Sequence, residues 1–204
     1  MVKKRKYGMK KRAELQRETR RRIVEATVEL HRTLGPAHTT VKEIAQRAGI
    51  NRLTVYNNFP DIADLLRACS KRWTEQNPAP DPTPWTKIRD PQERLRTALT
   101  ELYGYYARTE PMRANVLRDA ETMPALASLL EGTVVRYLRS VRDLLAEGWE
   151  VRDEGRRRLL AMLALAIDFQ TWRSLERGSS LSREEAVQSM LEAVRACVSH
   201  PGFR

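Results

Sequence analysis

Cysteine, histidine and long apolar runs are scarce in this sequence, and each scarcity argues against a class of protein. The two cysteines, Cys69 and Cys197, lie far apart and without metal-ligand spacing, which favours buried free thiols over a disulfide or a zinc site. The three histidines, His31, His38 and His200, have no plausible catalytic partner at local spacing, and there is no glycine-rich phosphate loop. We therefore expect a protein that is not an enzyme and needs no cofactor and no metal.

The sequence has no run of about 18 uncharged apolar residues that could span a bilayer. Its start is basic and polar, without the apolar segment of a signal peptide. We therefore expect a cytoplasmic protein with no membrane partner. Hydrophobic residues make up 41% of the chain and charged residues 31%, and a length of 204 residues fits a small module joined to a larger helical body.

Positive charge is concentrated in the first third of the chain. Residues 1–72 hold 18 lysines and arginines against 7 acidic residues, a net charge of +11, whereas residues 73–204 hold 19 of each kind. A basic module binds phosphates by releasing condensed counterions. The split therefore predicts one nucleic-acid-binding module and a second module that faces something neutral.

Residues 1–18 are strongly basic and have few apolar positions to bury. We expect a disordered or partly helical arm whose later part extends the first helix. Such an arm either lies along DNA, on the backbone or in a minor groove, or serves solubility alone.

A first amphipathic helix is predicted to begin at Thr19 and to end at Gly35-Pro36. Its apolar residues recur at i, i+3, i+7 and i+11, which places them on one face. They are Ile23, Ala26, Leu30 and Leu34.

Residues 40–59 predict two short helices joined by a tight turn. Thr40 and Glu43 have the spacing of a capping box at the start of the first helix. Gly49 suits the left-handed conformation of a helix end, and Asn51 suits the cap of the second helix. The inward anchors of that second helix are Val55 and Phe59. This spacing is typical of a helix-turn-helix.

A Thr-aliphatic-Tyr-x-x-Phe string, Thr54 to Phe59, follows the turn. With it stand Thr40, Ile44-Ala45, Ala48-Gly49-Ile50 and Leu65-Leu66. These residues make the segment 23–66 similar to the DNA-binding domain of the TetR family of bacterial repressors. The resemblance implies an all-α fold, with an N-terminal three-helix helix-turn-helix DNA-binding domain and a C-terminal helical ligand-binding and dimerisation domain.

The segment departs from the family pattern at two places. Many members carry Gly where this chain has Leu53, whose side chain either touches a thymine methyl or packs against the turn. Many also carry a basic residue just after the Phe, where this chain has Pro60. One phosphate contact is then missing, and Arg20 to Arg22 are candidates to compensate, while Asp61 suits the cap of the next helix.

The second helix of the pair is predicted to face the DNA groove with its remaining residues. These are Arg52, Leu53, Thr54, Tyr56, Asn57 and Asn58. Arg52 suits guanine edges or a phosphate, and Asn57 or Asn58 suits adenine. The hydroxyls of Thr54 and Tyr56 suit phosphate oxygens. The first turn of the preceding helix is a further phosphate site, with Thr40 and Lys42.

Residues 62–73 form an apolar helical stripe that predicts a mechanical link between the two modules. The stripe consists of Ile62, Leu65, Leu66, Cys69 and Trp73. Four prolines in residues 78–85 preclude a helix there and favour an extended loop. The expected organisation is an arm at 1–18, a DNA-binding domain at 19–72 and a ligand-binding and dimerisation domain at 73–204.

The body from Asp90 onward is helical by its apolar period. One stripe consists of Leu95, Leu99, Leu102, Tyr103 and Tyr106, and another consists of Leu126, Leu130, Val134, Leu138, Val141 and Leu145. Residues 112–120 between them predict a short separate helix. Residues 159–172 are apolar nearly all round, which predicts a helix buried on two sides, and Ser182 with Glu185 begins a last helix.

Excess apolar surface on the last two helices predicts either a homodimer built by pairing them or the closure of the domain core alone. A dimer matches a palindromic operator in double-stranded DNA. The resemblance also implies a pocket whose small hydrophobic or amphipathic effector releases a repressor from that operator. Pocket candidates are Trp85, Tyr103, Tyr106, Met112, Asn115, Arg118, Asp119, Met123, Asp168, Phe169 and Trp172. Each aromatic residue or methionine among them also suits the core.

Asp168 is a carboxylate inside an otherwise apolar predicted helix, where it is costly unless paired. It therefore faces the effector, pairs with a basic residue such as Arg173, or lies at the dimer seam. The alternative to an effector-controlled repressor is a ligand-independent regulator or an architectural basic DNA-binding protein, and the latter would bind any duplex equally at matched salt.

Overall fold

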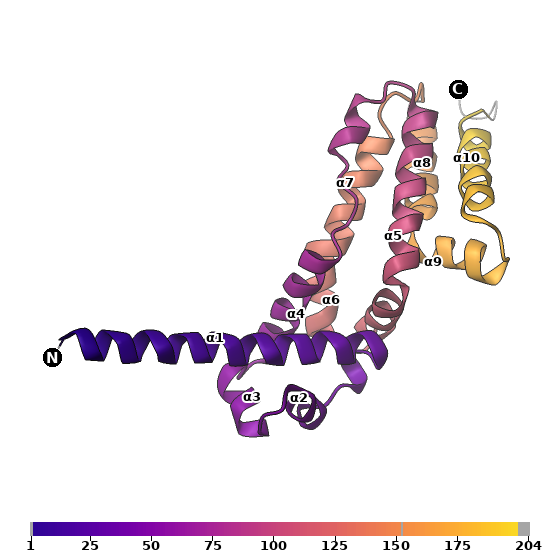
Figure 1. The fold of residues 1–204 in the computed structure, drawn as a ribbon. Coiled ribbons are helices and arrows are strands. Elements are labelled where there is room, and N and C mark those ends of the chain that lie inside the picture. The colour runs from indigo at the N-terminus through magenta and orange to yellow at the C-terminus, as the bar shows by residue number, and fades with distance from the viewer. Residues whose placement is uncertain (1, 152, 200–204) are drawn as a thin grey trace. The chain divides into compact units, whose positions relative to one another are not determined.

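The computed structural model describes residues 2–151 and 153–199, and all regular structure in that part of the chain is helical, without a strand (Figure 1). The predicted all-α fold is confirmed. Contacts divide the chain into two units, one of residues 1–78 and 111–130 and the other of residues 79–110 and 131–204. No helix of the described residues is long and apolar enough to cross a membrane.

The first unit is built on the helix α1 (Val2–Thr33). The short turn η1 (Pro36–His38) follows, and then α2 (Val41–Ala48), α3 (Arg52–Asn58) and α4 (Ile62–Gln76). Figure 1 shows α2 and α3 beneath α1, whose N-terminal half runs on past them. The core between these helices contains Ile23, Val24, Val28, Ile44, Val55, Phe59, Leu65 and Cys69.

Helix α1 begins at Val2, so the stretch 1–18 that we expected to be disordered or partly helical is helical from Val2 onward. Lysine, arginine, glutamate and glutamine are good helix formers, so a polar sequence can hold this conformation without a buried face. Arg21 forms ion pairs with Glu18 at 2.7 Å and with Glu25 at 3.1 Å, which are favourable spacings along a helix.

Helix α5 (Pro91–Ala120) crosses from one unit to the other at Pro111. The separate short helix predicted for residues 112–120 is therefore wrong. Proline inside a helix removes one hydrogen bond and crowds the preceding turn. Buried residues on both sides of the proline, Tyr106 and Met112, supply packing that offsets this cost. Helix α6 (Pro124–Leu130) completes the first unit.

The second unit begins with the 3-10 turn η2 (Thr83–Lys87) and the first part of α5. It continues with the π-helical turn η3 (Glu131–Val135), α7 (Arg136–Leu145), α8 (Asp153–Ala166), α9 (Phe169–Arg173), the π-helical turn η4 (Ser174–Gly178) and α10 (Arg183–Ser199). Helix α8 contacts both α7 and α10. The largest fully buried side chains of the unit are Trp85, Trp172, Tyr103, Tyr106, Phe169, Leu95, Leu99, Leu102, Leu145 and Leu159.

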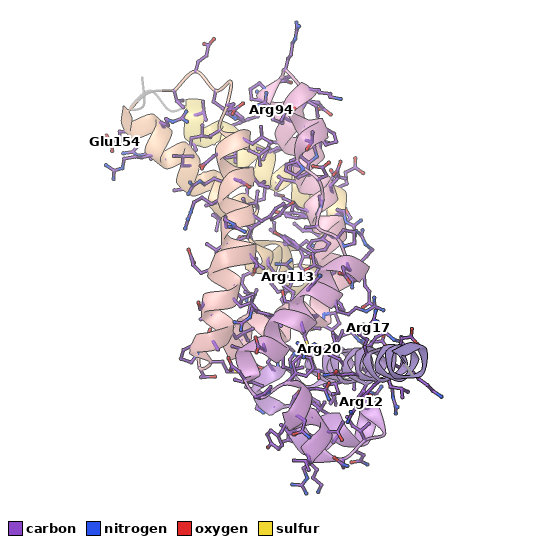
Figure 2. The ribbon with its side chains drawn as sticks, turned by 90° about the vertical axis from the view of Figure 1, so that its left-hand side faces the viewer. Arg12, Arg17, Arg20, Arg94, Arg113 and Glu154 are labelled. Atoms are coloured by element: carbon purple, nitrogen blue, oxygen red, sulfur yellow. The ribbon has the colours of Figure 1, made fainter. Side chains whose placement is uncertain are left out.

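The proline-rich segment is less extended than predicted, because residues 83–87 form the 3-10 turn η2. The side chain of Trp85 in this turn is completely buried. Pro80 accepts a hydrogen bond of 2.7 Å from the Tyr137 hydroxyl. Arg94 of α5, labelled in Figure 2, is buried and donates to the carbonyl oxygens of Ile88 and Glu147. These bonds hold the segment before α5 and the end of α7 within one unit.

Two apolar residues lie outside the faces predicted for them. Leu34 is exposed because α1 ends at Thr33, one residue before it. Ile62 is exposed because it occupies the first position of α4, before the buried stripe of that helix begins. The two units do not coincide with the predicted domains, because residues 111–130 pack with the first unit. Whether residues 1–18, 19–72 and 73–204 fold independently stays a prediction.

Candidate nucleic-acid interface

Local capping fixes the helices α2 and α3. The Thr40 hydroxyl accepts from the Glu43 backbone N–H at 3.3 Å, and the Glu43 carboxylate accepts from the Thr40 N–H at 2.8 Å. The backbone N–H and the hydroxyl of Thr40 both donate to this carboxylate and hold the pKa of Glu43 below its usual value. Gly49 ends α2 in the left-handed region at φ 64°, and the Asn51 side chain accepts from the Thr54 N–H at 2.8 Å. The predicted caps and turn are confirmed.

Helix α3 has a buried side and an open side. Val55 and Phe59 are buried in the core of the first unit. On the open side lie Arg52, Leu53, Tyr56 and Asn57, all exposed. Leu53 is 67% exposed, so of the two alternatives for this residue the structure favours the outward one. The open side offers one cation, one amide, one phenol and one apolar group to a groove.

Two of the residues predicted to contact DNA are partly engaged within α3. Thr54 donates its hydroxyl hydrogen to Asn51 Oδ1 at 2.8 Å, and Asn58 donates from Nδ2 to the Thr54 carbonyl at 2.8 Å. Thr40 and Lys42 are exposed at the start of α2, where the helix dipole favours a phosphate. Contact of all eight residues with DNA stays a prediction.

The basic triplet of α1 is tied into the protein. Arg20 donates to the Asn58 carbonyl, Arg22 donates to the Ala48 carbonyl, and Arg21 pairs with Glu18 and Glu25. That these arginines also replace the missing phosphate contact stays a prediction, since all three are exposed. Figure 2 shows Arg12, Arg17 and Arg20 on α1, and all three are exposed.

Asp61 caps α4 by accepting from the Ala63 N–H at 2.9 Å, as predicted. Within the first unit α4 packs against α1, and Arg72 of α4 pairs with Glu25 of α1 at 3.1 Å. Cys69 is buried in that contact, and burial raises the pKa of its thiol to about 12. This cysteine is thus an uncharged core residue at neutral pH.

Three residues predicted to bind an effector hold the junction between α1 and η1 instead of standing free. Asn115 Nδ2 donates to the carbonyl oxygens of His31 and Arg32, and the Asn115 side chain thereby caps the end of α1. Arg118 donates to the Leu34 carbonyl at 3.0 Å. Asp119, which is 3% exposed, accepts from the Ala37 N–H at 2.9 Å and pairs with Arg118 at 2.7 Å.

Burial raises the pKa of the Asp119 carboxyl, but the hydrogen bonds from Arg118 and Ala37 outweigh it, so the pKa lies below its usual value. His31 lies buried beside this group, and desolvation lowers its pKa to about 4. The junction therefore holds a neutral imidazole next to a charged carboxylate at neutral pH. Met112, which is buried, and Met123, which is half-buried, lie in the same unit.

Four of the remaining effector candidates, Tyr103, Tyr106, Phe169 and Trp172, form an aromatic cluster in the second unit. Tyr103 donates to the Ala166 carbonyl at 2.9 Å, and Tyr106 donates to the Ile167 carbonyl at 2.6 Å. The ring of Phe169 lies 5.6 Å from that of Tyr106 and 5.3 Å from that of Trp172. Burial raises the pKa of the Tyr103 hydroxyl, and the nearby carboxylates of Glu176 and Asp168 raise it further, so it stays a donor.

The carbonyl oxygens that the two tyrosines bind lie where α8 ends. The helix predicted through residues 159–172 is interrupted at Ile167–Asp168, and Asp168 caps α9 by accepting from Gln170 N at 2.7 Å. The placement of Asp168 inside a helix is therefore wrong, because a carboxylate that follows a helix end can cap the next one. Within the described residues, the indole N–H groups of Trp85 and Trp172 are buried without a hydrogen-bond partner.

Acidic, histidine and cysteine side chains of the described residues form no group of three or more that could hold a metal ion. Sequence reasoning missed two features of this region. One is that Arg20 and Arg22 of α1 donate to carbonyl oxygens at the C-terminal ends of α3 and α2. The other is that Arg118 and Asp119 bond the backbone at the junction of α1 and η1. No sequence signal identifies these contacts, because their partners lie 26 to 84 residues away.

Comparisons with known proteins fall on the same region. Residues 23–69 match the family described as bacterial regulatory proteins, tetR family. No curated protein matches the chain.

Solved structures resemble most of the chain. A TetR-family transcriptional regulator from Streptomyces coelicolor has a TM-score of 0.58 at 16% identity, and the match covers 87% of this chain and 81% of that one. A transcriptional regulator from Rhodococcus sp. Rha1 has a TM-score of 0.58 at 16% identity, over 88% and 95%. RolR in complex with the ligand resorcinol has a TM-score of 0.51 at 20% identity, over 93% and 97%. The shared feature is the fold of TetR-family transcriptional regulators, with the matched module at its N-terminal end.

Proposed function

We propose, from the TetR-family module that the chain carries at residues 23–69, that this protein is a sequence-specific DNA-binding transcriptional regulator that acts as a dimeric repressor. The observation that carries the proposal is the open side of α3. A helix-turn-helix reads DNA by placing its second helix in the major groove, where side chains reach base edges. Exposed Arg52, Leu53, Tyr56 and Asn57 supply the donors, acceptors and apolar group for such reading.

Supporting charge lies in the same part of the chain. The excess of +11 in residues 1–72 suits a polyanion, and exposed Arg12 and Lys42 are available to phosphates. Phosphate contacts set orientation, whereas contacts to bases set specificity. Sequencing the DNA fragments that the purified full-length protein selects tests the proposal. A repressor enriches one palindromic sequence, whereas an architectural binder enriches none.

Arg52→Ala is expected to weaken binding to the selected operator by about 1–3 kcal/mol and to relax the base preference at one position in each half-site. Arg52 is exposed on α3, where a bidentate contact to guanine is within the reach of its side chain. Gel shifts across all single base substitutions measure both effects. Lys42→Ala is the matched control. Lys42 is proposed to bind a phosphate, so its loss should weaken binding to all DNA sequences alike. If Arg52→Ala also weakened binding to every sequence equally, Arg52 would not read a base.

The proposed homodimer forms through the last two long helices, α8 and α10, which pack on each other in one unit. Helix α8 leaves Ala161, Ala164 and Leu165 exposed at i, i+3 and i+4, and Leu165 is 51% exposed. A face of this kind suits close pairing with a symmetry mate.

Leu165→Glu is therefore expected to turn a dimer into a monomer, because it places a charge on that apolar face. Light scattering after gel filtration gives the mass. The control is Glu154→Gln at the start of the same helix, labelled in Figure 2, where the side chain is exposed and pairs with Arg158. A dimer that survives Leu165→Glu would place the interface elsewhere.

The proposed effector is a small hydrophobic or amphipathic molecule that binds in the second unit and lowers affinity for the operator. The aromatic cluster of Tyr103, Tyr106, Phe169 and Trp172 and the unpartnered indole N–H groups suit such a molecule. RolR was solved with resorcinol, which is a small aromatic molecule. An effector of the repressor must stabilise the folded protein and weaken its DNA binding, so thermal shift and gel shift across one panel of small phenols and amphipathic compounds test it.

A further inference from the structure

The reading helix α3 is short, and its C-terminal end has no cation of its own. It spans Arg52–Asn58 and has no basic residue in its last turn. Helices of this length are marginal in water without outside contacts. Asn51 satisfies the first turn, but the last carbonyl groups need a donor from elsewhere in the protein.

Arg20 of α1 supplies that donor. Its Nη1 donates to the Asn58 carbonyl oxygen at 2.5 Å. Its guanidinium carbon lies 3.8 Å from the centre of the Phe59 ring, the residue that ends α3 and anchors it in the core. One side chain thus holds the end of α3 by a charge-assisted hydrogen bond and by stacking on an aromatic ring.

Arg22, two positions further along α1, donates to the C-terminal end of α2 in the same way. Its Nη2 donates to the Ala48 carbonyl oxygen and lies 3.4 Å from the Gly49 carbonyl oxygen. The basic residue in the last turn of α2 is Arg47, which lies 3.6 Å from Glu29. A cation at the C-terminal end of a helix is favourable because the helix dipole places negative charge there.

We propose that Arg20 and Arg22 are positioning residues that set the orientation of α3 in the DNA groove, by tying the C-terminal ends of α3 and α2 to α1. The inference rests on the proposed function, since an orientation matters only if α3 reads bases. Base readout requires geometry held within a fraction of an ångström, so a helix that can tilt or fray loses specific contacts. Phosphate attraction depends on total charge and survives such a tilt.

The test uses the full-length variants Arg20→Gln and Arg22→Gln, compared with Arg17→Gln. Arg17 lies on α1, is exposed, and donates only to Ala13 of its own helix among the bonds described for it. All three substitutions remove one positive charge and keep a good helix former. Amide hydrogen exchange of the free protein is measured first, and then binding to the selected operator and to an unrelated duplex across a salt series.

We expect amides of α3 to exchange faster in Arg20→Gln and those of the α2–α3 turn to exchange faster in Arg22→Gln, with no change in Arg17→Gln. The ratio of specific to nonspecific affinity should fall about tenfold in the first two variants, the loss of one charge-assisted hydrogen bond. The slope of log affinity against log salt concentration, called the salt slope below, should be the same in these two variants as in Arg17→Gln.

The proposal is overturned if exchange and the affinity ratio keep their wild-type values while the salt slope falls by about 0.9 relative to Arg17→Gln, because the arginines are then phosphate ligands. A wild-type protein that prefers no sequence would instead refute the proposed function. In that case faster exchange in α3 still supports the tie to α1, and unchanged exchange overturns it.

Discussion

Gly35→Ala should cost the protein about 3 kcal/mol or more of its free energy of unfolding. Gly35 has φ 100° and ψ 156°, a backbone conformation that is open to glycine and strained for other residues. A Cβ atom at this position would also overlap Nη2 of Arg118 and Oδ2 of Asp119. Relief of the overlap requires the buried Asp119 carboxylate to give up its bond to Ala37 or its pairing with Arg118.

Urea unfolding followed by circular dichroism measures this loss. The matched control is Gly132→Ala, where an added Cβ meets nothing within 4 Å and the backbone is helical. That substitution should raise stability by up to about 1 kcal/mol, since alanine is the better helix former. Equal midpoints for the two variants would show that the junction of α1 and η1 tolerates a side chain, contrary to its geometry.

Local signals predicted the helix-turn-helix well. The Thr40 capping box, the left-handed Gly49, and the Asn51 and Asp61 caps all stand where the sequence placed them. Each of the caps at Thr40, Asn51 and Asp61 depends on a side chain within four residues of the backbone group that it satisfies, so a single sequence contains the whole interaction. The Ser182 capping box of α10 was predicted for the same reason.

Helix lengths were predicted less well where a breaker and tertiary packing compete. Proline argues for a break at Pro111, yet α5 runs through it because buried residues on both sides hold one helix. The reverse holds at Asp168, where an unbroken apolar run argues for one helix and the chain ends α8 and caps α9 instead. Propensity is a weak prior that packing overrides.

Long-range polar contacts lay beyond the sequence altogether. The sequence predicted a phosphate contact for Arg20 and Arg22, and the family resemblance made Arg118 and Asp119 candidates for an effector site. Nothing local assigned these side chains a partner within the protein. The carbonyl oxygen of Asn58 and the N–H of Ala37 become partners only once α1 crosses α3 and α5 meets η1. For this reason the candidate DNA contacts could be predicted residue by residue, and the contacts that orient them could not.

The same junction should make stability depend on pH through His31. Its pKa in the folded protein is about 4, against 6.5 for the unfolded chain, because burial disfavours the imidazolium. Below pH 6.5 the unfolded state therefore binds a proton that the folded state does not, and stability falls as pH falls until the folded pKa is reached. The expected loss is about 2 kcal/mol between pH 7 and pH 5, a window above the range in which carboxylates titrate.

Urea unfolding at pH 7, 6 and 5 measures this dependence. His31→Gln should flatten the profile in that window, because the replacement does not titrate. His38→Gln, at an exposed position of η1 beside the same junction, should keep the wild-type profile. The charge of Asp119 raises the pKa of His31 and so opposes the effect of burial. The pKa of Asp119 itself is depressed, so its contribution to stability is lost only below about pH 4, as the carboxylate gains a proton. A wild-type profile that is flat from pH 7 to pH 5 would mean that the imidazole reaches water in the folded protein.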